Sequence, residues 1–260
     1  MDMLTAFMHL GEEGAIVKDE SRGSGTPINK VGDSLELYVR NLFGKDSLFS
    51  YIGNPNNPPD LIIEGGEALE IKKVSGARTD IALNSSPPKA KLRVDDPMLT
   101  VGCRECEEGW KVKDMVYVIG TVKDRTDILE NIWFVYGDCY AADDEVYRTV
   151  KDRLAHGVNL VAGEDRVAKT NEIGRINEVD PLGITYLRVR GMWGIRHPQK
   201  VFGHLTSDDH NAFMLIPKEK FLSFGMGKEG LKDVSVEDVD IPSPNNPAKN
   251  IDAVLLQKRI

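Results

Sequence analysis

The sequence contains few cysteines, no apolar run of membrane-spanning length and no excess of positive charge. Its three cysteines, Cys103, Cys106 and Cys139, are too few for a disulfide framework, and an odd number is typical of a reducing compartment. The longest apolar-rich run, residues 115–122, has the length of a strand and falls far short of the roughly 20 residues that cross a bilayer. The N-terminus carries Asp2 where a signal peptide would be basic. We therefore expect a cytoplasmic protein.

The formal net charge of −8 argues against a protein that coats nucleic acid non-specifically, because such binding normally requires a basic surface. The charge is nevertheless uneven along the chain. Residues 72–93 hold six basic residues against one acidic residue, so that this segment carries +5. The basic residues are Lys72, Lys73, Arg78, Lys89, Lys91 and Arg93, and the acidic one is Asp80. A local basic cleft is therefore compatible with the composition.

The length of 260 residues predicts a single domain, with residues 1–25 and 238–260 at its periphery. Amphipathic spacing predicts helices over residues 31–43 and 143–156, the second ending at Gly157. Short apolar or β-branched runs predict strands over residues 61–63, 68–74, 115–122, 132–136, 184–189 and 213–216.

Loops are expected over the polar residues 84–97 and in the Pro/Asn-rich tail over residues 238–250. Together these elements predict an α/β fold. We expect a mixed central sheet of about four or five strands flanked by helices, with the hairpin over residues 61–74 at one end of the sheet.

Two acids and a lysine lie on the two strands of that hairpin. Asp60 opens the first strand, and Glu70 stands two residues before Lys72 on the second. Residues i and i+2 of a strand share a face, so Glu70 and Lys72 point the same way, and the hairpin brings Asp60 beside them. Two neighbouring carboxylates repel each other, and a hard cation such as Mg²⁺ relieves this repulsion. We therefore expect a magnesium site formed by Asp60, Glu70 and the carbonyl of Ile71.

Lys72 supplies what phosphodiester hydrolysis further requires. Magnesium bound by few carboxylates keeps several waters and coordinates phosphate oxygens. The Lys72 ammonium can orient or help deprotonate the attacking water and offset the charge on the pentavalent phosphorane. The competing interpretation is a solvated, charged hairpin, because this short spacing arises often by chance. Lys73 points to the opposite face and is interpreted as structural or backbone-binding.

The residues Pro59-Asp60 and Glu70-Ile71-Lys72 carry the PD-(D/E)xK nuclease signature. Longer blocks at residues 56–60, 83–86, 135–141, 180–186 and 191–195 resemble the NgoPII-type type II restriction endonucleases. These blocks lie in order within residues 30–200 and are far more specific than the short signature. The first 25 residues and the tail beyond Gly203 match no block of that family that we can name.

The resemblance implies a PD-(D/E)xK restriction-endonuclease-like fold and a Mg²⁺-dependent enzyme that cuts double-stranded DNA. It further implies GGCC as the recognition site, a homodimer, and a cognate DNA methyltransferase that acts on the same site. In this fold an acid of the early helix sometimes completes the metal site, which makes Glu36 a candidate ligand. The alternative for Glu36 is a solvated helix glutamate.

Two polar and basic regions are candidates for DNA contact. One is the loop that contains Asn84, Ser85, Ser86, Lys89, Lys91 and Arg93, and the other contains Arg188, Arg190 and Arg196. Arginine is the usual bidentate reader of guanine O6 and N7, whereas lysines of a loop can position phosphates. The alternatives are a solvated surface loop and an ordinary charged strand face.

Two other functions are consistent with these residues. A structure-specific or repair nuclease would keep the fold and read branched or damaged DNA by its shape. A DNA-binding protein of the same fold would have lost the metal, but the presence of all three catalytic positions argues against it. For Cys103 and Cys106 a buried thiol pair is favoured over half of a zinc site, because no second Cys-x-x-Cys or Cys/His pair follows at suitable spacing.

Overall fold

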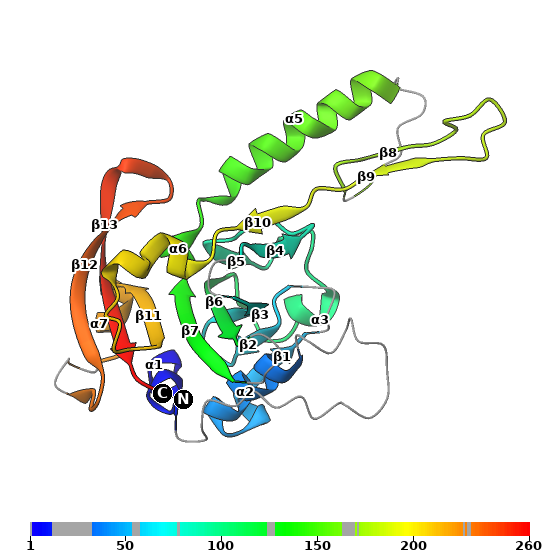
Figure 1. The fold of residues 1–260 in the computed structure, drawn as a ribbon. Helices are drawn as coiled ribbons and strands as arrows, with labels where there is room; N and C mark the ends of the chain where they lie inside the picture. The colour runs from blue at the N-terminus through cyan, green and yellow to red at the C-terminus, as the bar shows by residue number, and fades with distance from the viewer. Residues whose placement is uncertain are drawn as a thin grey trace.

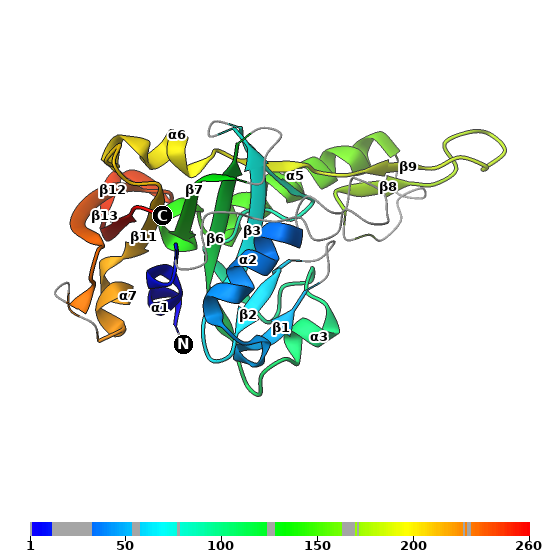
Figure 2. The same ribbon diagram turned by 60° about the horizontal axis from the view of Figure 1, so that its bottom comes forward.

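A mixed β-sheet forms the centre of the protein (Figures 1 and 2). The computed structural model describes residues 2–11, 33–53, 58–76, 79–123, 128–162, 170, 172–225, 227 and 230–260. The strands lie in the order β1 (Phe49–Ile52), β2 (Leu61–Ile63), β3 (Ala68–Ser75), β6 (Val112–Val122), β7 (Leu129–Tyr136), β11 (Ala212–Pro217), β13 (Asn246–Lys258) and β12 (Ser235–Ser243). A further strand, β5 (Lys91–Arg93), pairs with β6.

The sheet is mixed, as the sequence predicts, because two of its pairings are parallel. Strand β3 runs parallel to β6 and β7 runs parallel to β11, and the remaining pairs are antiparallel. The β2–β3 hairpin lies near one end of the sheet, with only β1 beyond it. The described residues contribute nine strands to the sheet, more than the four or five expected.

Apolar side chains of the alternating strands build a core on each face of the sheet. One core contains residues of the helices α1 (Met3–Met8), α2 (Asp33–Phe43) and α7 (Lys218–Ser223). The other contains residues of β4 (Ile81–Asn84), α3 (Val101–Arg104), α4 (Gly137–Tyr140) and α6 (Pro198–Phe202). The predicted arrangement of a sheet flanked by helices is therefore confirmed.

The predicted helix over residues 31–43 corresponds to α2, and its first two residues lie outside the described residues. The predicted end of the second helix at Gly157 is wrong, because α5 (Asp144–Ala162) continues through this residue. A single glycine weakens a helix without ending it, and the apolar pattern resumes directly after it. The loop expected over residues 84–97 contains β5, whose buried Leu92 packs on the second core.

The loop predicted for residues 238–250 is also wrong, because this tail forms the long strands β12 and β13. Strand β12 lies at the edge of the sheet, where Pro242 is tolerated at an irregularity in the pairing. Strand β13 lies between β11 and β12 and contributes the fully buried Leu255 and Leu256. Only Pro244 and Asn245 of this proline- and asparagine-rich tail lie in the turn between the two strands.

Both termini belong to the core and not to its periphery. Met3, Leu4 and Phe7 of α1 are fully buried, and the Phe7 ring packs edge-on against Phe134 of β7 at 5.8 Å. Lys258 Nζ donates a hydrogen bond to the Leu10 carbonyl at 2.7 Å. The C-terminal end of the chain accordingly lies beside the residues at the end of α1.

An arm projects from this body in both views (Figures 1 and 2). It consists of α5 and of the hairpin formed by β8 (Gly174–Ile176) and β9 (Leu187–Val189). The strand β10 (Trp193–Ile195), which pairs with β4, joins the arm to the body. Among the helices of the described residues, none is long and apolar enough to cross a membrane.

Replacing Leu255 by alanine tests whether the C-terminal strand belongs to the core. We expect Leu255→Ala to lower the free energy of unfolding by roughly 2–5 kcal/mol, because it leaves a cavity at a fully buried position. Leu222→Ala, at a leucine that is 63% exposed, should change it by less than about 0.5 kcal/mol. Urea denaturation measures both variants, and equal midpoints would contradict the central place of β13.

Candidate active site

The backbone of the β2–β3 hairpin holds Asp60 beside the second strand. The Asp60 amide donates a hydrogen bond to the Leu69 carbonyl at 3.0 Å, and the Ile71 amide donates one to Asp60 Oδ2 at 2.6 Å. These bonds place the Asp60 carboxylate next to the residues that flank Ile71. The contact predicted from the hairpin between Asp60 and the Glu70–Lys72 pair is therefore present.

Lys72 lies between the two carboxylates. Its Nζ is 2.7 Å from Glu70 Oε1 and 3.6 Å from Asp60 Oδ2. Glu70 and Lys72 share the face of β3 that carries Ala68, as the alternation of side chains along a strand requires. Their side chains are mostly buried, with 12% exposure for Glu70 and 27% for Lys72. Solvent therefore screens the charges of this group only weakly.

Burial and charge shift the pKa values of these groups. Burial raises the pKa of Glu70 above its usual value, and the neighbouring negative charge of Asp60 raises it further, against the opposing effect of Lys72. Burial by itself would lower the pKa of Lys72, but the charges of Glu70 and Asp60 outweigh it and hold that pKa above its usual value. Lys72 is therefore a cation at neutral pH. Its single positive charge is shared by two carboxylates and cannot neutralise both of them.

Glu70 also has a free coordinating oxygen. Its Oε2 is buried and has no hydrogen-bond partner, while Oε1 is engaged by Lys72. A buried carboxylate oxygen without a partner is costly, and together with Asp60 it offers the hard oxygen donors that Mg²⁺ prefers. Within the described residues no three acidic, histidine or cysteine side chains are grouped to hold a metal ion. The site thus fits a cation that is held by two carboxylates and completed by backbone oxygens or water.

Helix α2 carries the predicted ligand Glu36 and packs on the other face of β3. Lys73, which follows Lys72 and points the opposite way, donates a hydrogen bond from Nζ to Ser34 Oγ of this helix at 2.6 Å. Glu36 forms an ion pair with Arg40 at 3.9 Å. Its role as a metal ligand stays a prediction, because the structure does not group it with Asp60 and Glu70.

The predicted DNA-binding residue Lys89 is buried next to Glu70 of the candidate site. It is 6% exposed, its ammonium pairs with Asp96, and it lines a small cavity together with Glu70, Ser86 and Tyr117. A phosphate contact by Lys89 would require breaking the pair with Asp96. Burial raises the pKa of Glu70, and the charge of Lys89 makes only the smallest of the contributions that oppose this rise.

Sequence reasoning did not single out Tyr117, which fixes the loop over Glu70. Tyr117 lies in register with Glu70 on the neighbouring parallel strand β6. Its hydroxyl accepts a hydrogen bond from the Lys89 amide at 2.6 Å and donates one to the Lys89 carbonyl at 3.1 Å. The only hint of this role in the sequence is that Tyr117 is a polar-tipped side chain within the apolar run over residues 115–122.

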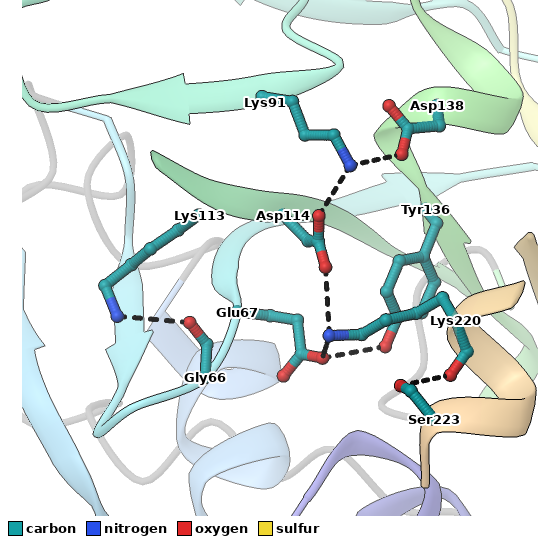
Figure 3. Close-up of polar contacts among 9 residues, drawn as sticks. All are labelled: Gly66, Glu67, Lys91, Lys113, Asp114, Tyr136, Asp138, Lys220 and Ser223. Carbon is teal, nitrogen blue, oxygen red and sulfur yellow. Dashed lines mark hydrogen bonds and ion pairs between the residues drawn. The ribbon is translucent and has the colours of Figure 1, made fainter. Parts of the chain in front are cut away.

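Lys91 is likewise occupied by acids of the same chain, as Figure 3 shows. Its Nζ is 2.6 Å from Asp114 Oδ1 and also pairs with Asp138. Lys220 continues the chain of ion pairs from Asp114 at 2.9 Å to the buried Glu67 at 3.0 Å. This network ties β5, β6, α4 and α7 together. Most of the positive charge expected at Lys91 is therefore offset within the fold.

Arg93, the last basic residue of that loop, is more accessible. Its side chain is 54% exposed and pairs with Asp95, which is 69% exposed, at 3.2 Å. Exposed pairs of this kind are weak, so that Arg93 can exchange its partner for a phosphate at small cost.

The arm brings several other predicted DNA-binding residues into one groove. Asn84 and Ser85 line it from the end of β4, and Arg188 and Arg190 line it from β9 and the residues after it. The two arginines do share a strand face, because both pair with Glu172: Arg188 Nε lies 2.9 Å from Glu172 Oε2. Arg196 is exposed but lies outside the lining residues of this groove.

The cysteines are free thiols. Cys103 and Cys139 are buried and Cys106 is half-buried, so a buried thiol pair is confirmed for Cys103 and only in part for Cys106. Burial raises the pKa of the Cys103 thiol to about 12 and keeps it protonated. A zinc site receives no support, because the described residues contain no suitable group of three ligands.

Comparison of the sequence with known proteins shows which family the chain belongs to. The family model for the NgoPII restriction endonuclease matches residues 1–244. The type II restriction enzyme NgoPII of Neisseria gonorrhoeae is 37% identical over 277 aligned residues, which cover 98% of this chain and 99% of that protein. The similarity therefore includes the termini, which match no family block on inspection. No solved structure matched the chain. The chain belongs to the NgoPII restriction endonuclease family.

Proposed function

We propose that this protein is a type II restriction endonuclease that uses Mg²⁺ to hydrolyse phosphodiester bonds of double-stranded DNA. The observation that carries the proposal is the arrangement of two largely buried carboxylates around one lysine: Lys72 Nζ lies 3.6 Å from Asp60 and 2.7 Å from Glu70. Membership of the restriction endonuclease family supports the choice of DNA as substrate. The whole chain acts as one endonuclease domain with the PD-(D/E)xK fold.

Asp60 and Glu70 would hold the metal, with the Ile71 carbonyl as a third ligand and Glu36 as a further candidate. Glu70 would use Oε2, the oxygen that is buried without a partner. When bound, Mg²⁺ lowers the pKa of water and neutralises charge on the phosphate. Lys72 orients the attacking water or takes part in its deprotonation, and its fixed positive charge offsets the charge of the phosphorane.

Replacing Lys72 separates chemistry from binding. We expect Lys72→Ala to retain specific DNA binding in Ca²⁺ but to lose cleavage in Mg²⁺ by a factor on the order of 10²–10³, because a preorganised charge is removed from the transition state. Raising the pH should restore part of the rate if Lys72 mainly helps to generate hydroxide.

The matched control is Lys73→Ala, because the ammonium of Lys73 contacts Ser34 on the opposite face of β3. This variant should cleave within a few-fold of wild type. Single-turnover cleavage of a duplex that contains GGCC measures both rates. A fast Lys72→Ala variant together with a slow Lys73→Ala variant would contradict the proposal and transfer the catalytic role from Lys72 to Lys73.

We propose that the groove of the arm reads the DNA sequence. Arg188 and Arg190 would exchange Glu172 for guanine, while Asn84 and Ser85 contact the same region from β4. Arg93, Ser86 and Arg196 would contact the backbone at the margins of the site. Lys89 and Lys91 would contribute through their positive potential, because both are already paired with acids of the chain.

We further propose GGCC as the recognition site, a homodimer as the active assembly, and a cognate methyltransferase that protects the same sequence. A palindromic site presents two symmetry-related phosphates, and a two-fold dimer matches them with one active centre each. Arg188 of each subunit would then contact a guanine of one half-site in place of Glu172.

Digestion of one sequenced plasmid, with and without methylation at GGCC, tests this function. We expect Mg²⁺-dependent cuts confined to GGCC in the unmodified plasmid and no cuts after methylation. Arg188→Ala should spread the cuts to related sequences, since a bidentate arginine contributes roughly 1–3 kcal/mol of discrimination between bases. Cleavage that ignores methylation and follows branched or damaged DNA would favour a structure-specific or repair nuclease instead.

A further inference from the structure

The ribbon formed by β8 and β9 has two sides with different surroundings. On one side, Gly174 packs against Val158 of α5 so closely that a side chain at residue 174 would collide with it. Arg175 and its register partner Arg188 come next along the two strands and point to the opposite side. Arg190 shares that side with Arg188. This side, called the arginine side below, therefore carries three guanidinium groups.

Arg175 is the one arginine of this side without an acid partner among the described residues. The other two both pair with Glu172. Arg175 Nε donates a hydrogen bond to Asn177 Oδ1 at 3.1 Å, and its guanidinium lies 4.4 Å from the centroid of the Tyr186 ring. The amide oxygen and the ring fix the direction of the guanidinium without neutralising its charge. The ribbon thus holds a positive charge in place and leaves it unpaired.

The pairing of the strands makes an anion at this position favourable. Arg175 lies directly opposite Arg188, and like charges at such positions destabilise an antiparallel pair. Glu172 offsets the charge of Arg188 and leaves that of Arg175. An anion bound at Arg175 would remove the remaining repulsion.

The turn at the end of the ribbon contains two acids, but neither pairs with Arg175. The Asp180 carboxylate accepts hydrogen bonds from the amide and the hydroxyl of Thr185, both at 2.6 Å. The Glu178 side chain lies against Gly183. The anion that Arg175 can bind must therefore come from outside the described chain.

The position of Arg175 favours DNA as the source of this anion. The arginine side continues from the groove that Arg188 and Arg190 line beside the end of β4. A two-stranded ribbon fits the major groove of B-DNA, and the DNA backbone presents a regular row of phosphates along that groove. A ribbon that brings its two inner arginines to base edges therefore brings Arg175 near the backbone.

We propose that Arg175 binds a phosphate of the DNA backbone next to the bases that the groove reads, and that Tyr186 is a positioning residue for this contact. Arginine can give a phosphate two parallel N–H donors, and both Nη groups remain for this because Asn177 occupies Nε. Such a contact carries no sequence information and sets the position of the ribbon on the duplex. It rests on the proposed function in one respect, since the groove of the arm must bind DNA.

Salt-dependent binding distinguishes this backbone contact from base recognition. Binding is measured in Ca²⁺, without cleavage, to one duplex with GGCC and one with a changed site. Arg175→Ala should weaken both complexes by a similar factor, roughly tenfold, and lower the slope of log K against log salt by about one. Arg188→Ala should instead reduce the preference for GGCC. The control Lys218→Ala, which removes a charge that pairs with Asp238, should bind as wild type does.

Uncharged methylphosphonates, placed at one phosphate of the GGCC duplex at a time, locate the contact. One of these substitutions should weaken the wild type and have no further effect on Arg175→Ala, because the same interaction is already lost. Tyr186→Phe keeps the ring and should respond as wild type does. Tyr186→Ala should lose part of the sensitivity at that phosphate.

Two results would overturn the contact. One is an Arg175→Ala variant with the affinity and salt slope of wild type, and the other is an equal response of both proteins to every methylphosphonate. Full sensitivity of Tyr186→Ala would remove the positioning role of Tyr186. A protein that binds both duplexes equally, yet loses one phosphate contact on Arg175→Ala, would refute the proposed recognition of GGCC and keep the backbone contact.

Discussion

The hydrogen bond from the Ile71 amide to the Asp60 carboxylate is the contact on which the candidate active site depends. It holds Asp60, the residue before β2, beside β3, so that Lys72 lies between the carboxylates of Asp60 and Glu70. With both acids ionised, the three largely buried groups carry a net negative charge. Lys72 offsets this charge only in part, which leaves Glu70 with a raised pKa and an oxygen without a partner. Shifted pKa values of this kind cluster at functional sites, and this supports the proposed role of the three residues.

The basic residues around this site are arranged differently from what the sequence predicts. The basic segment over residues 72–93 does not form a continuous DNA-binding surface, because Lys89 and Lys91 are paired with Asp96, Asp114 and Asp138. These pairs tie the loop to the sheet and hold it above Glu70. Arg93 of this segment is exposed, and two further accessible arginines, Arg188 and Arg190, lie on the projecting arm beside the end of β4. In the proposed function, catalysis and recognition therefore belong to different parts of the chain, the sheet and its arm.

The sequence predicts the features that depend on neighbouring residues. The hairpin of Asp60, Glu70 and Lys72 is one of these, since strand alternation and a short turn determine its geometry. The burial of Lys89 could not be predicted in this way, because it depends on the hydroxyl of Tyr117, 28 residues further along the chain. Strand β13 was missed for a similar reason: its place between β11 and β12 is set by pairing with distant strands, while prolines and asparagines dominate the local signal.

The claim that the two carboxylates form a metal site is tested most directly by diffraction from crystals soaked in Mn²⁺, a substitute for Mg²⁺ with detectable anomalous scattering. We predict an anomalous peak at roughly 2.1 Å from Asp60 and from Glu70 Oε2, with Lys72 displaced from between them. The peak should be absent from crystals of Glu70→Gln. Manganese bound elsewhere, or bound equally well by that variant, would contradict the assignment of Asp60 and Glu70 as the metal ligands.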